Sequence, residues 1–343
     1  MKTNILMPVF DGEDAVRATI ESVLGQTFGD FTFVIVDDGS TDGTLRVLED
    51  VAAADRRVRV VPLGRNGGII RALNAGLEHL DANCDFLARI DCGDLCAPDR
   101  LEKQVGFLAA NRDCAVVASR FEMFCTEGPL SDGILRFQRF TNALCAHDEI
   151  VANFTVMSPL HHPTLAFRRD VFAEVGPYDE AYQAAEDYEL VERILTRGLR
   201  VAKLPEVLVR CRFTPGRGIS QTRRIQQVKT ALEVKLRFVG ANYLEDDARL
   251  RCVIWGSHEF AGYLAEILAE GRHCLDPICF TDSDPGTWGR ELSGLRVLPP
   301  DEAVAAPAPG DIVITMWNID RDAIVEYLAR RGWTRNRNLF VFS

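Results

Sequence analysis

Carboxylates follow several of the predicted strands, at the point where each strand ends. Residues 33–44 read Phe-Val-Ile-Val-Asp-Asp-Gly-Ser-Thr-Asp-Gly-Thr, so a run of β-forming residues stops at Asp37 and Asp38. A second apolar run ends in Ala-Arg-Ile-Asp-Cys-Gly-Asp, which carries Asp91 and Asp94. Carboxylates accept hydrogen bonds from a base or ribose, and a pair at a rigid strand end suits a hard divalent cation that also binds phosphate. The pattern predicts a site for a phosphorylated ligand.

Two more polar clusters follow predicted strands. Pro8 and Phe10 stand at the end of strand 3–9, and Asn66 follows strand 58–62 and precedes two glycines. The carboxyl ends of parallel strands meet at one edge of a sheet, where open α/β sheets bind their ligands. Neighbouring glycines let the backbone approach such a ligand closely. We therefore expect all four clusters to line one pocket.

Strands and helices alternate along the first 120 residues. This βαβα order is typical of a largely parallel sheet with right-handed crossovers. The predicted strands are 3–9, 31–36, 58–62, 84–90 and 114–118. Residues 120–160 break the rhythm, and we expect an antiparallel excursion and helices around an acceptor cleft there. The later predicted elements are a strand at 165–167, a helix at 186–197, a strand at 207–213 and a long basic helix at 221–239.

A second α/β unit begins near residue 250. Its predicted elements are strands at 251–255, 277–281, 311–316 and 338–341 and helices at 260–270 and 322–331. A dinucleotide site would need Gly-x-Gly-x-x-Gly after the first strand, but the chain reads Gly-Ser-His-Glu-Phe-Ala-Gly from Gly256. Because the middle glycine is missing, docking or oligomerisation is favoured for this unit over nucleotide or sugar binding.

Seven ordered motifs resemble those of the inverting family 2 glycosyltransferases, which have the GT-A fold. They span roughly residues 1–240 in the expected order. The motifs are Ile5-Leu6-Met7-Pro8-Val9-Phe10, Asp37-Asp38-Gly39-Ser40-Thr41-Asp42, Asn66-Gly67-Gly68-Ile69, Ala88-Arg89-Ile90-Asp91-Cys92-Gly93-Asp94, His162-Pro163-Thr164, Gly176-Pro177-Tyr178-Asp179 and Ala185-Glu186-Asp187-Tyr188.

The resemblance implies a role for each matching residue. Asp187 would be the general base that deprotonates the acceptor hydroxyl, and Mg²⁺ or Mn²⁺ would bind at Asp91 and Asp94 and stabilise the departing diphosphate. The implied nucleotide-binding residues are Pro8, Phe10, Asp38, Asn66, Arg71 and Asp91, and the implied acceptor or diphosphate residues are His162, Glu186 and Arg212. The donor would be a UDP-, dTDP- or GDP-sugar, and the acceptor a glycan or a lipid-linked glycan of the bacterial surface.

The resemblance also implies a domain organisation. Residues 1–240 would form the glycosyltransferase domain, with a nucleotide-sugar half at 1–119 and an acceptor half at 120–240. A linker at 241–249 would lead to a smaller Rossmann-like domain at 250–343.

The chain departs from the family pattern at two motifs. Gly93 replaces the middle carboxylate of the usual Asp-Ala-Asp-Asp, and Thr214 stands where a histidine is frequent. The Gln-x-x-Arg-Trp motif of processive members is missing, so we expect one sugar to be transferred per encounter.

Composition narrows the function classes. A net charge of −11 disfavours a nucleic-acid binder, because such proteins need a basic field. No apolar run reaches the length of a membrane span, and the ten scattered cysteines suit a reducing cytoplasm. We therefore expect a cytoplasmic protein. Peripheral contact with the inner face of the membrane and a homo-oligomeric state are compatible with the sequence.

Three alternatives stay open at this point. The first is a nucleotidyltransferase acting on sugar phosphates, which would be expected to carry a glycine-rich phosphate loop within residues 6–20; this segment has none. The second is a non-catalytic scaffold that binds nucleotide-sugars, suggested by Gly93 and the extra domain. The third is NAD-dependent chemistry in the C-terminal unit.

Overall fold

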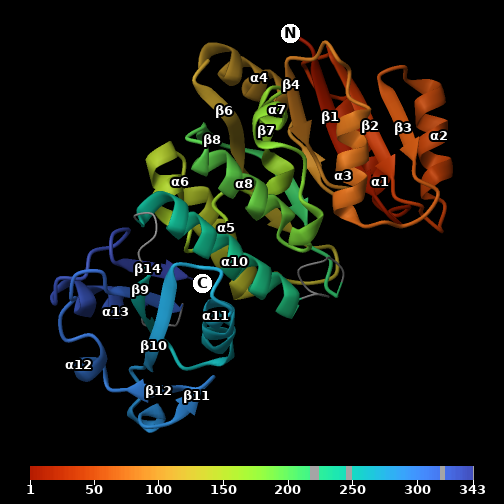
Figure 1. Ribbon diagram of the computed structural model, residues 1–343. Helices are drawn as coiled ribbons and strands as arrows, with labels where there is room; N and C mark the ends of the chain where they lie inside the picture. Colours follow the sequence, from red (N-terminus) through yellow and green to blue (C-terminus); the bar gives the residue numbers. More distant parts are fainter. Residues whose placement is uncertain (217–223, 245–248, 317–320, 343) are drawn as a thin grey trace. The chain divides into compact units, whose positions relative to one another are not determined.

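The computed structural model describes residues 1–216, 224–244, 249–316 and 321–342 (Figure 1). Contacts divide the chain into two compact units, each with its own sheet. The first unit comprises Met1–Val151 and Pro159–Thr222, and the second Ala152–Ser158 and Arg223–Ser343.

An eight-stranded sheet organises the first unit, in the order β3-β2-β1-β4-β7-β6-β8-β5. Strands β3, β2, β1 and β4 are parallel, β7 is antiparallel to both β4 and β6, β8 is parallel to β6, and β5 is antiparallel to β8. The strands are β1 (Thr3–Val9), β2 (Phe31–Asp37), β3 (Val58–Pro62), β4 (Phe86–Arg89), β5 (Leu95–Cys96), β6 (Cys114–Phe124), β7 (Ala166–Arg168) and β8 (Arg200–Arg212).

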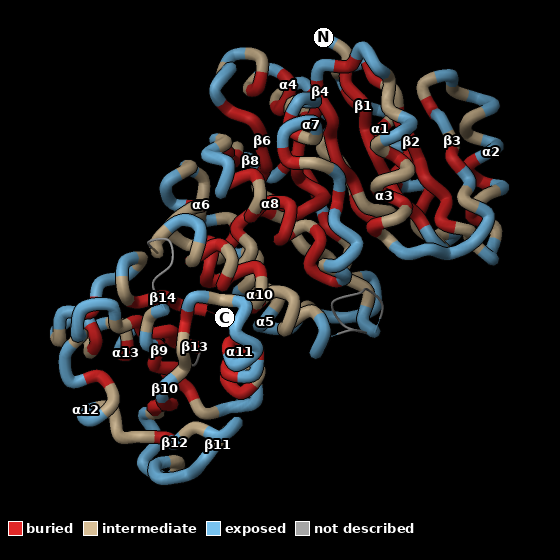
Figure 2. The backbone as a smooth tube through the Cα atoms, viewed as in Figure 1, coloured by how far each residue is buried: buried red, intermediate tan, exposed pale blue. Residues whose placement is uncertain are grey.

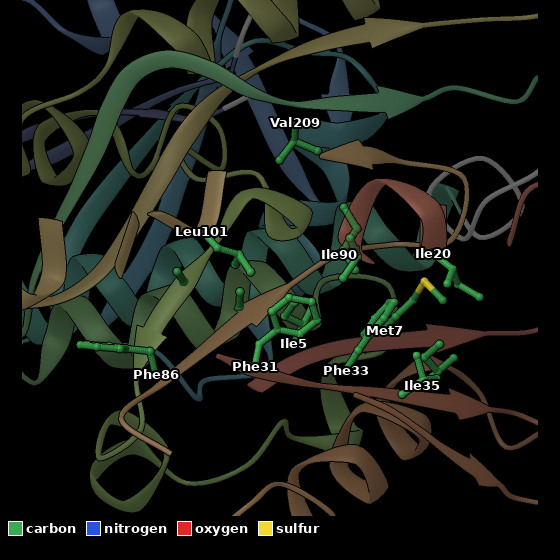
Figure 3. Close-up of a cluster of buried hydrophobic side chains, with 14 of the residues drawn as sticks. Ile5, Met7, Ile20, Phe31, Phe33, Ile35, Phe86, Ile90, Leu101 and Val209 are labelled. Carbon is green, nitrogen blue, oxygen red and sulfur yellow. The ribbon is translucent and has the colours of Figure 1, made fainter. Parts of the chain in front are cut away.

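Helices cover both faces of this sheet. One apolar cluster joins α1, α2 and α4 to the face that carries Ile5, Met7 and Phe33 (Figure 3). On the other face, α3 packs so closely that a Cβ at Gly76 would lie 2.2 Å from Leu6 Cδ1. Covered faces explain why β1 and β2 read as nearly continuous apolar runs, buried along their length in Figure 2. The helices of the first unit are α1 (Val16–Leu24), α2 (Thr44–Ala54), α3 (Ile69–Glu78), α4 (Arg100–Ala110), α5 (Asp132–Ala143), α6 (His147–Asn153, whose last two residues belong to the second unit), α7 (Val171–Val175) and α8 (Glu186–Thr196).

Two strands are longer than the sequence predicts. β6 continues to Phe124, and β8 starts at Arg200, seven residues before the predicted start. Pro205 interrupts the strand pattern in the sequence, since proline cannot donate to a ladder. The pairing of β6 with β8 absorbs it through a register shift, from Ser119↔Leu204 to Arg120↔Val207, as β-bulges do.

The second unit is a six-stranded sheet in the order β11-β12-β10-β9-β13-β14. All its strand pairs are parallel except β11 with β12. Helices α10 and α11 pack on one face, and α12 and α13 on the other. The elements are α10 (Arg224–Tyr243), β9 (Leu250–Trp255), α11 (Glu259–Ala269), β10 (Leu275–Thr281), β11 (Glu291–Leu292), β12 (Leu295–Leu298), α12 (Pro300–Ala303), β13 (Ile312–Met316), α13 (Arg321–Ala329) and β14 (Leu339–Phe342).

Helix α10 groups with the second unit by contacts, whereas the sequence predicts it at the end of a first domain that spans residues 1–240. Its residues Leu232, Leu236 and Val239 belong to the apolar core of the second unit, so by contacts the division falls near residue 222. The boundary at residue 240, with its linker at 241–249, stays a prediction about separate domains. Residues 221–223 of the predicted helix and 245–248 of the linker lie outside the described residues. Among the described helices, none combines the length and the apolar character that a membrane span needs.

Candidate functional site

Asp38 fastens the glycine loop that precedes α3. Its Oδ1 accepts a hydrogen bond from the Gly67 N–H at 2.9 Å, and its Oδ2 accepts one from the Gly68 N–H at 2.7 Å. Asn66 Oδ1 also accepts from Gly68, at 3.1 Å. The Arg71 side chain lies against Gly67, where a Cβ would come within 2.4 Å of Arg71 Cδ. The structure therefore brings Asp38, Asn66 and Arg71 together, and Asp38 orders the loop that precedes α3.

The loops after β1 and β2 are joined by polar contacts. The Asp11 N–H donates to Ser40 Oγ at 3.0 Å, and Asp11 Oδ1 accepts from the Thr41 N–H at 2.7 Å. Phe10, beside these contacts, keeps 43% of its surface exposed, whereas Pro8 is buried in β1. Phe10 is thus the residue of this edge that offers an aromatic face to a ligand.

Arg89 lies fully buried at the end of β4 and holds Asp91. Its Nη2 donates to Asp91 Oδ1 at 2.5 Å. Burial has the largest effect and works to raise the pKa of Asp91, but the charge of Arg89, its hydrogen bond and other nearby groups together hold this pKa below its usual value. Asp91 is therefore an ionised carboxylate at the strand end, with its side chain 37% exposed.

Asp94 lies on the other side of a glycine turn and has the opposite character. It is 4% exposed, and its Oδ1 accepts from the Arg212 main-chain N–H at 2.8 Å. Burial, reinforced by the negative charge of Asp91, raises the pKa of Asp94 well above its usual value. The pKa values of the two carboxylates are thus shifted in opposite directions.

Gly93 adopts a backbone conformation that side chains disfavour. Its φ is +102°, and a Cβ would meet Arg212 Cδ at 3.3 Å. Its N–H donates to Thr19 Oγ1 at 2.8 Å. This turn lets Asp91 and Asp94 stand side by side without a third carboxylate, and it leaves Arg212 next to them. Among the described residues, the Arg212 Nε is buried without a hydrogen-bond partner.

His161 and His162 have separate surroundings. His161 stacks 4.3 Å from the Phe121 ring, and burial lowers its pKa to about 4. His162 is 5% exposed and contacts Arg89 and the Tyr178 hydroxyl, the latter at 2.8 Å from Nε2. Burial, aided by the Arg89 charge, lowers the pKa of His162 well below its usual value. Both rings are neutral at pH 7.

Glu186 and Asp187 open helix α8. Burial and the neighbouring Asp187 raise the pKa of Glu186 to about 8, and its Oε2 is buried without a partner among the described residues. Burial also raises the pKa of Asp187, and Asp91 raises it further, while the Tyr188 N–H donates to Oδ1 at 2.8 Å and acts against this. Asp91 thus acts electrostatically on the first two acids of α8, Glu186 and Asp187.

The structure assembles two groups of predicted residues. Arg89 acts electrostatically on Asp91, Glu186 and Asp187 and contacts His162, while the Asp91 charge acts on Asp94, which accepts from the Arg212 main chain. Pro8, Phe10, Asp38 and Asn66 lie at or just after the ends of β1 to β3, and Arg71 lies in α3. The loop after β4 contacts the loop after β1, because Cys92 Sγ lies 3.9 Å from the Gly12 carbonyl oxygen. The predicted residues did not include Arg89 or Tyr178 as site residues. The sequence did carry a signal for Arg89, since it is an arginine inside an apolar strand run. A buried guanidinium needs acidic partners, so such a residue is expected near carboxylates.

The donor set fits a divalent cation held jointly with a ligand. Asp91 and Asp94 are oxygen ligands, and Mg²⁺ is commonly bound by one or two carboxylates plus substrate phosphates. Burial raises the pKa of Asp94 most, and the charge of Asp91 adds to it, so the two carboxylates interact. The described ranges contain no cluster of three or more potential ligands from His, Cys, Asp and Glu. Phosphate oxygens would therefore have to complete the coordination.

Comparisons with known proteins place these residues in a family. Residues 4–176 match the family model described as glycosyl transferase family 2. The amylovoran biosynthesis glycosyltransferase AmsE of Erwinia amylovora is 28% identical over 61% of this chain and 75% of its own length.

Solved structures share the fold. TarS of S. aureus, residues 1–349 in complex with UDP-GlcNAc, superposes with a TM-score of 0.56 at 18% identity, over 78% of this chain and 72% of that one. The mannosyltransferase PcManGT of Pyrobaculum calidifontis, in complex with GDP-Man and Mn²⁺, gives a TM-score of 0.52 at 21% identity over 68% and 62%. The predicted α/β fold class, a GT-A-like sheet with a second smaller Rossmann-like unit, is confirmed. The chain belongs to glycosyl transferase family 2 and is a glycosyltransferase.

Proposed function

We propose that this chain transfers one sugar at a time, with inversion, from a nucleotide-sugar to a glycan or lipid-linked acceptor during surface polysaccharide synthesis. The electrostatic contact between Asp91, at the end of β4, and the acid pair of α8 carries the proposal. This interaction connects a carboxylate at the proposed donor edge with carboxylates of the proposed acceptor half. Direct displacement requires both, because the base on the acceptor side must act at the sugar that the donor side binds. The name of AmsE, a polysaccharide biosynthesis enzyme, supports the type of pathway.

Asp187 is the general base of this proposal. A base works best when its pKa lies near the working pH, and burial and Asp91 both shift the pKa of Asp187 in that direction. Its carboxylate would take the proton from the acceptor hydroxyl as that oxygen attacks the anomeric carbon. Glu186, with a pKa of about 8, is protonated at pH 7 and so leaves Asp187 as the charged member of the pair.

The donor side would bind the nucleotide diphosphate. Phe10 offers its exposed ring, while Asp38, Asn66 and Arg71 shape the glycine loop against which a nucleoside would pack. The Arg212 guanidinium, whose side chain lies beside Gly93 between the two carboxylates of the motif, would neutralise the departing diphosphate. Mg²⁺ or Mn²⁺, held by Asp91 and Asp94, would supply Lewis-acid stabilisation of the same charge. UDP-GlcNAc and GDP-Man, bound by the structural neighbours, are the donors to test first.

The test is release of nucleoside diphosphate from a panel of UDP-, dTDP- and GDP-sugars, with Mg²⁺ or Mn²⁺, in the presence of candidate acceptors. We expect one donor to turn over, and proton NMR of the product to show the opposite anomeric configuration. Asp187→Asn should abolish turnover, whereas Asp113→Asn, a change at an exposed surface ion pair with Arg200, should not. Retention of configuration, or an Asp187→Asn variant with wild-type turnover, would contradict the proposal.

A further inference from the structure

We propose that Arg89 is a positioning residue that couples the donor edge of the site to its acceptor half. Its guanidinium orients Asp91 and, through His162 and Tyr178, fixes the loop that leads to α8. This inference rests on the proposed function, since it assigns Asp91 to the donor and the start of α8 to the acceptor.

The guanidinium of Arg89 is held on every side. Besides Asp91, its Nη1 donates to the carbonyl oxygens of Leu6 at 3.0 Å and Ile90 at 2.6 Å, and its Nε donates to His162 Nε2 at 3.3 Å. The Arg100 Nη2 fixes the Arg89 carbonyl oxygen at 2.6 Å. The planar guanidinium of Arg89 therefore fixes the orientation of the Asp91 carboxylate. The single ammonium group of a lysine does not reproduce this geometry.

The contact continues to the acceptor half through Tyr178. The Tyr178 hydroxyl lies 2.8 Å from His162 Nε2, while its main chain is fixed by both amide atoms of Asn74, at 2.9 and 3.0 Å. Arg193, on α8, donates to the Pro177 carbonyl oxygen at 2.9 Å and pairs with Glu189 at 2.8 Å. An unbroken series of contacts thus runs from Asp91 to the helix that carries Glu186 and Asp187.

Charge explains why a cation belongs at this point. The Arg89 charge acts on Asp91, Glu186 and Asp187. The guanidinium is fully buried and forms an ion pair with Asp91, so it places a permanent positive charge next to that carboxylate.

Three variants test the coupling. Arg89→Lys keeps the charge and removes the fork, and Tyr178→Phe removes one hydroxyl. Arg168→Lys is the matched control, because Arg168 lies on the neighbouring strand β7 and donates to the carbonyl oxygens of Cys114, Leu108 and Asn111. Among the described residues, it makes no hydrogen bond or ion pair with Asp91, Asp94, Glu186 or Asp187. Each variant is compared with the wild type in three measurements. These are Tm, turnover of the donor that the panel of nucleotide-sugars identifies, and calorimetric affinity for Mn²⁺ with the matching nucleoside diphosphate.

We expect Arg89→Lys to lose about 10- to 100-fold in affinity for Mn²⁺ with the nucleotide, the usual cost of removing a partner of a metal ligand. Tyr178→Phe should keep that affinity and lose roughly tenfold in kcat, because it loosens the acceptor loop alone. Arg89→Lys with Tyr178→Phe should lose no more kcat than Arg89→Lys, since residues in one network are not additive. Arg168→Lys should lower Tm and leave kcat and affinity unchanged.

Two outcomes would overturn the inference. The first is an Arg89→Lys variant that matches Arg168→Lys in both affinity and kcat. The second is a double variant whose kcat losses multiply, as independent sites do. If Arg89→Lys fails to fold, Tyr178→Phe decides alone, and wild-type kcat in that variant rejects the coupling. If the wild-type chain turns over no donor, the proposed function is rejected instead. The affinity for Mn²⁺ with UDP or GDP then still tests whether Arg89 orients Asp91.

Discussion

Replacing Gly93 tests whether its backbone, rather than a missing carboxylate, defines the metal motif. The residue has φ +102°, and a Cβ would lie 3.3 Å from Arg212 Cδ, 3.5 Å from Arg212 Cβ and 3.8 Å from Ala15 Cβ. These contacts are tight but not severe, so backbone strain dominates the cost. A residue held in a sparsely populated conformation costs about 1–3 kcal/mol. For a unit of this size, such a loss lowers Tm by roughly 2–12 °C.

Two substitutions separate strain from charge. Gly93→Ala adds the strain alone, and Gly93→Asp restores the family's middle carboxylate. Because Asp91 already raises the pKa of Asp94, a further carboxylate should destabilise the metal-free protein more than alanine does. Mn²⁺ should recover part of that difference, because a ligand that binds only the native state raises Tm.

The assay is thermal unfolding of each variant with chelator and with Mn²⁺. Gly106→Ala is the control, because Gly106 is exposed inside α4 with no atom within 4 Å of an added Cβ. There the same chemical change should stabilise by up to about 1 kcal/mol. A Gly93→Ala variant as stable as Gly106→Ala would refute the reasoning from φ. A Gly93→Asp variant that Mn²⁺ stabilises no more than Gly93→Ala would show that the middle position is not a ligand.

Three further predictions concern the carboxylates. Asp187→Asn should lower kcat by about 10²- to 10⁴-fold, the usual contribution of a general base, while calorimetry shows unchanged nucleotide affinity. The pKa of Glu186 is raised in the folded state, so the folded protein holds an extra proton and stability should fall as the pH rises from about 5 to 8. Glu186→Gln should weaken that fall in Tm, and a variant with the wild-type slope would contradict it. Asp38→Ala leaves the Gly67 N–H group without its acceptor and the Gly68 N–H group with Asn66 alone, and it should cost about 1–3 kcal/mol in chemical denaturation. Its nucleoside diphosphate affinity should also fall, and wild-type affinity would separate Asp38 from the donor site.

The strand ends of the first unit were predictable because their signals are local. β1 and β3 have the predicted bounds, and β2 extends one residue further, to Asp37. Each apolar run stops at a glycine or a carboxylate, and that change in composition needs no distant partner. The placement of Asp38 and Asn66 at one edge then followed from parallel pairing, whereas Arg71 was named only through the family resemblance.

The order of the strands was less accessible. Strand β7 (Ala166–Arg168) lies between β4 and β6 and runs antiparallel to both, although it is far from them in the chain. A three-residue strand has too little pattern to reveal its neighbours. The same holds for α10, whose assignment to the second unit depends on Leu232, Leu236 and Val239 finding the core of that unit.

The sequence by itself determined the family motifs, the α/β alternation and the residue types of the site, because these are properties of short stretches. Tertiary structure decided in which direction the pKa of each carboxylate is shifted. Asp91 and Asp94 are three residues apart, yet Arg89 lowers the pKa of the first, and burial beside that charge raises the pKa of the second. Such differences depend on burial and on distances between remote segments, as in the contact of Arg89 with His162, 73 residues away. No local pattern encodes them, since the electrostatic energy of a group is set by the whole fold around it.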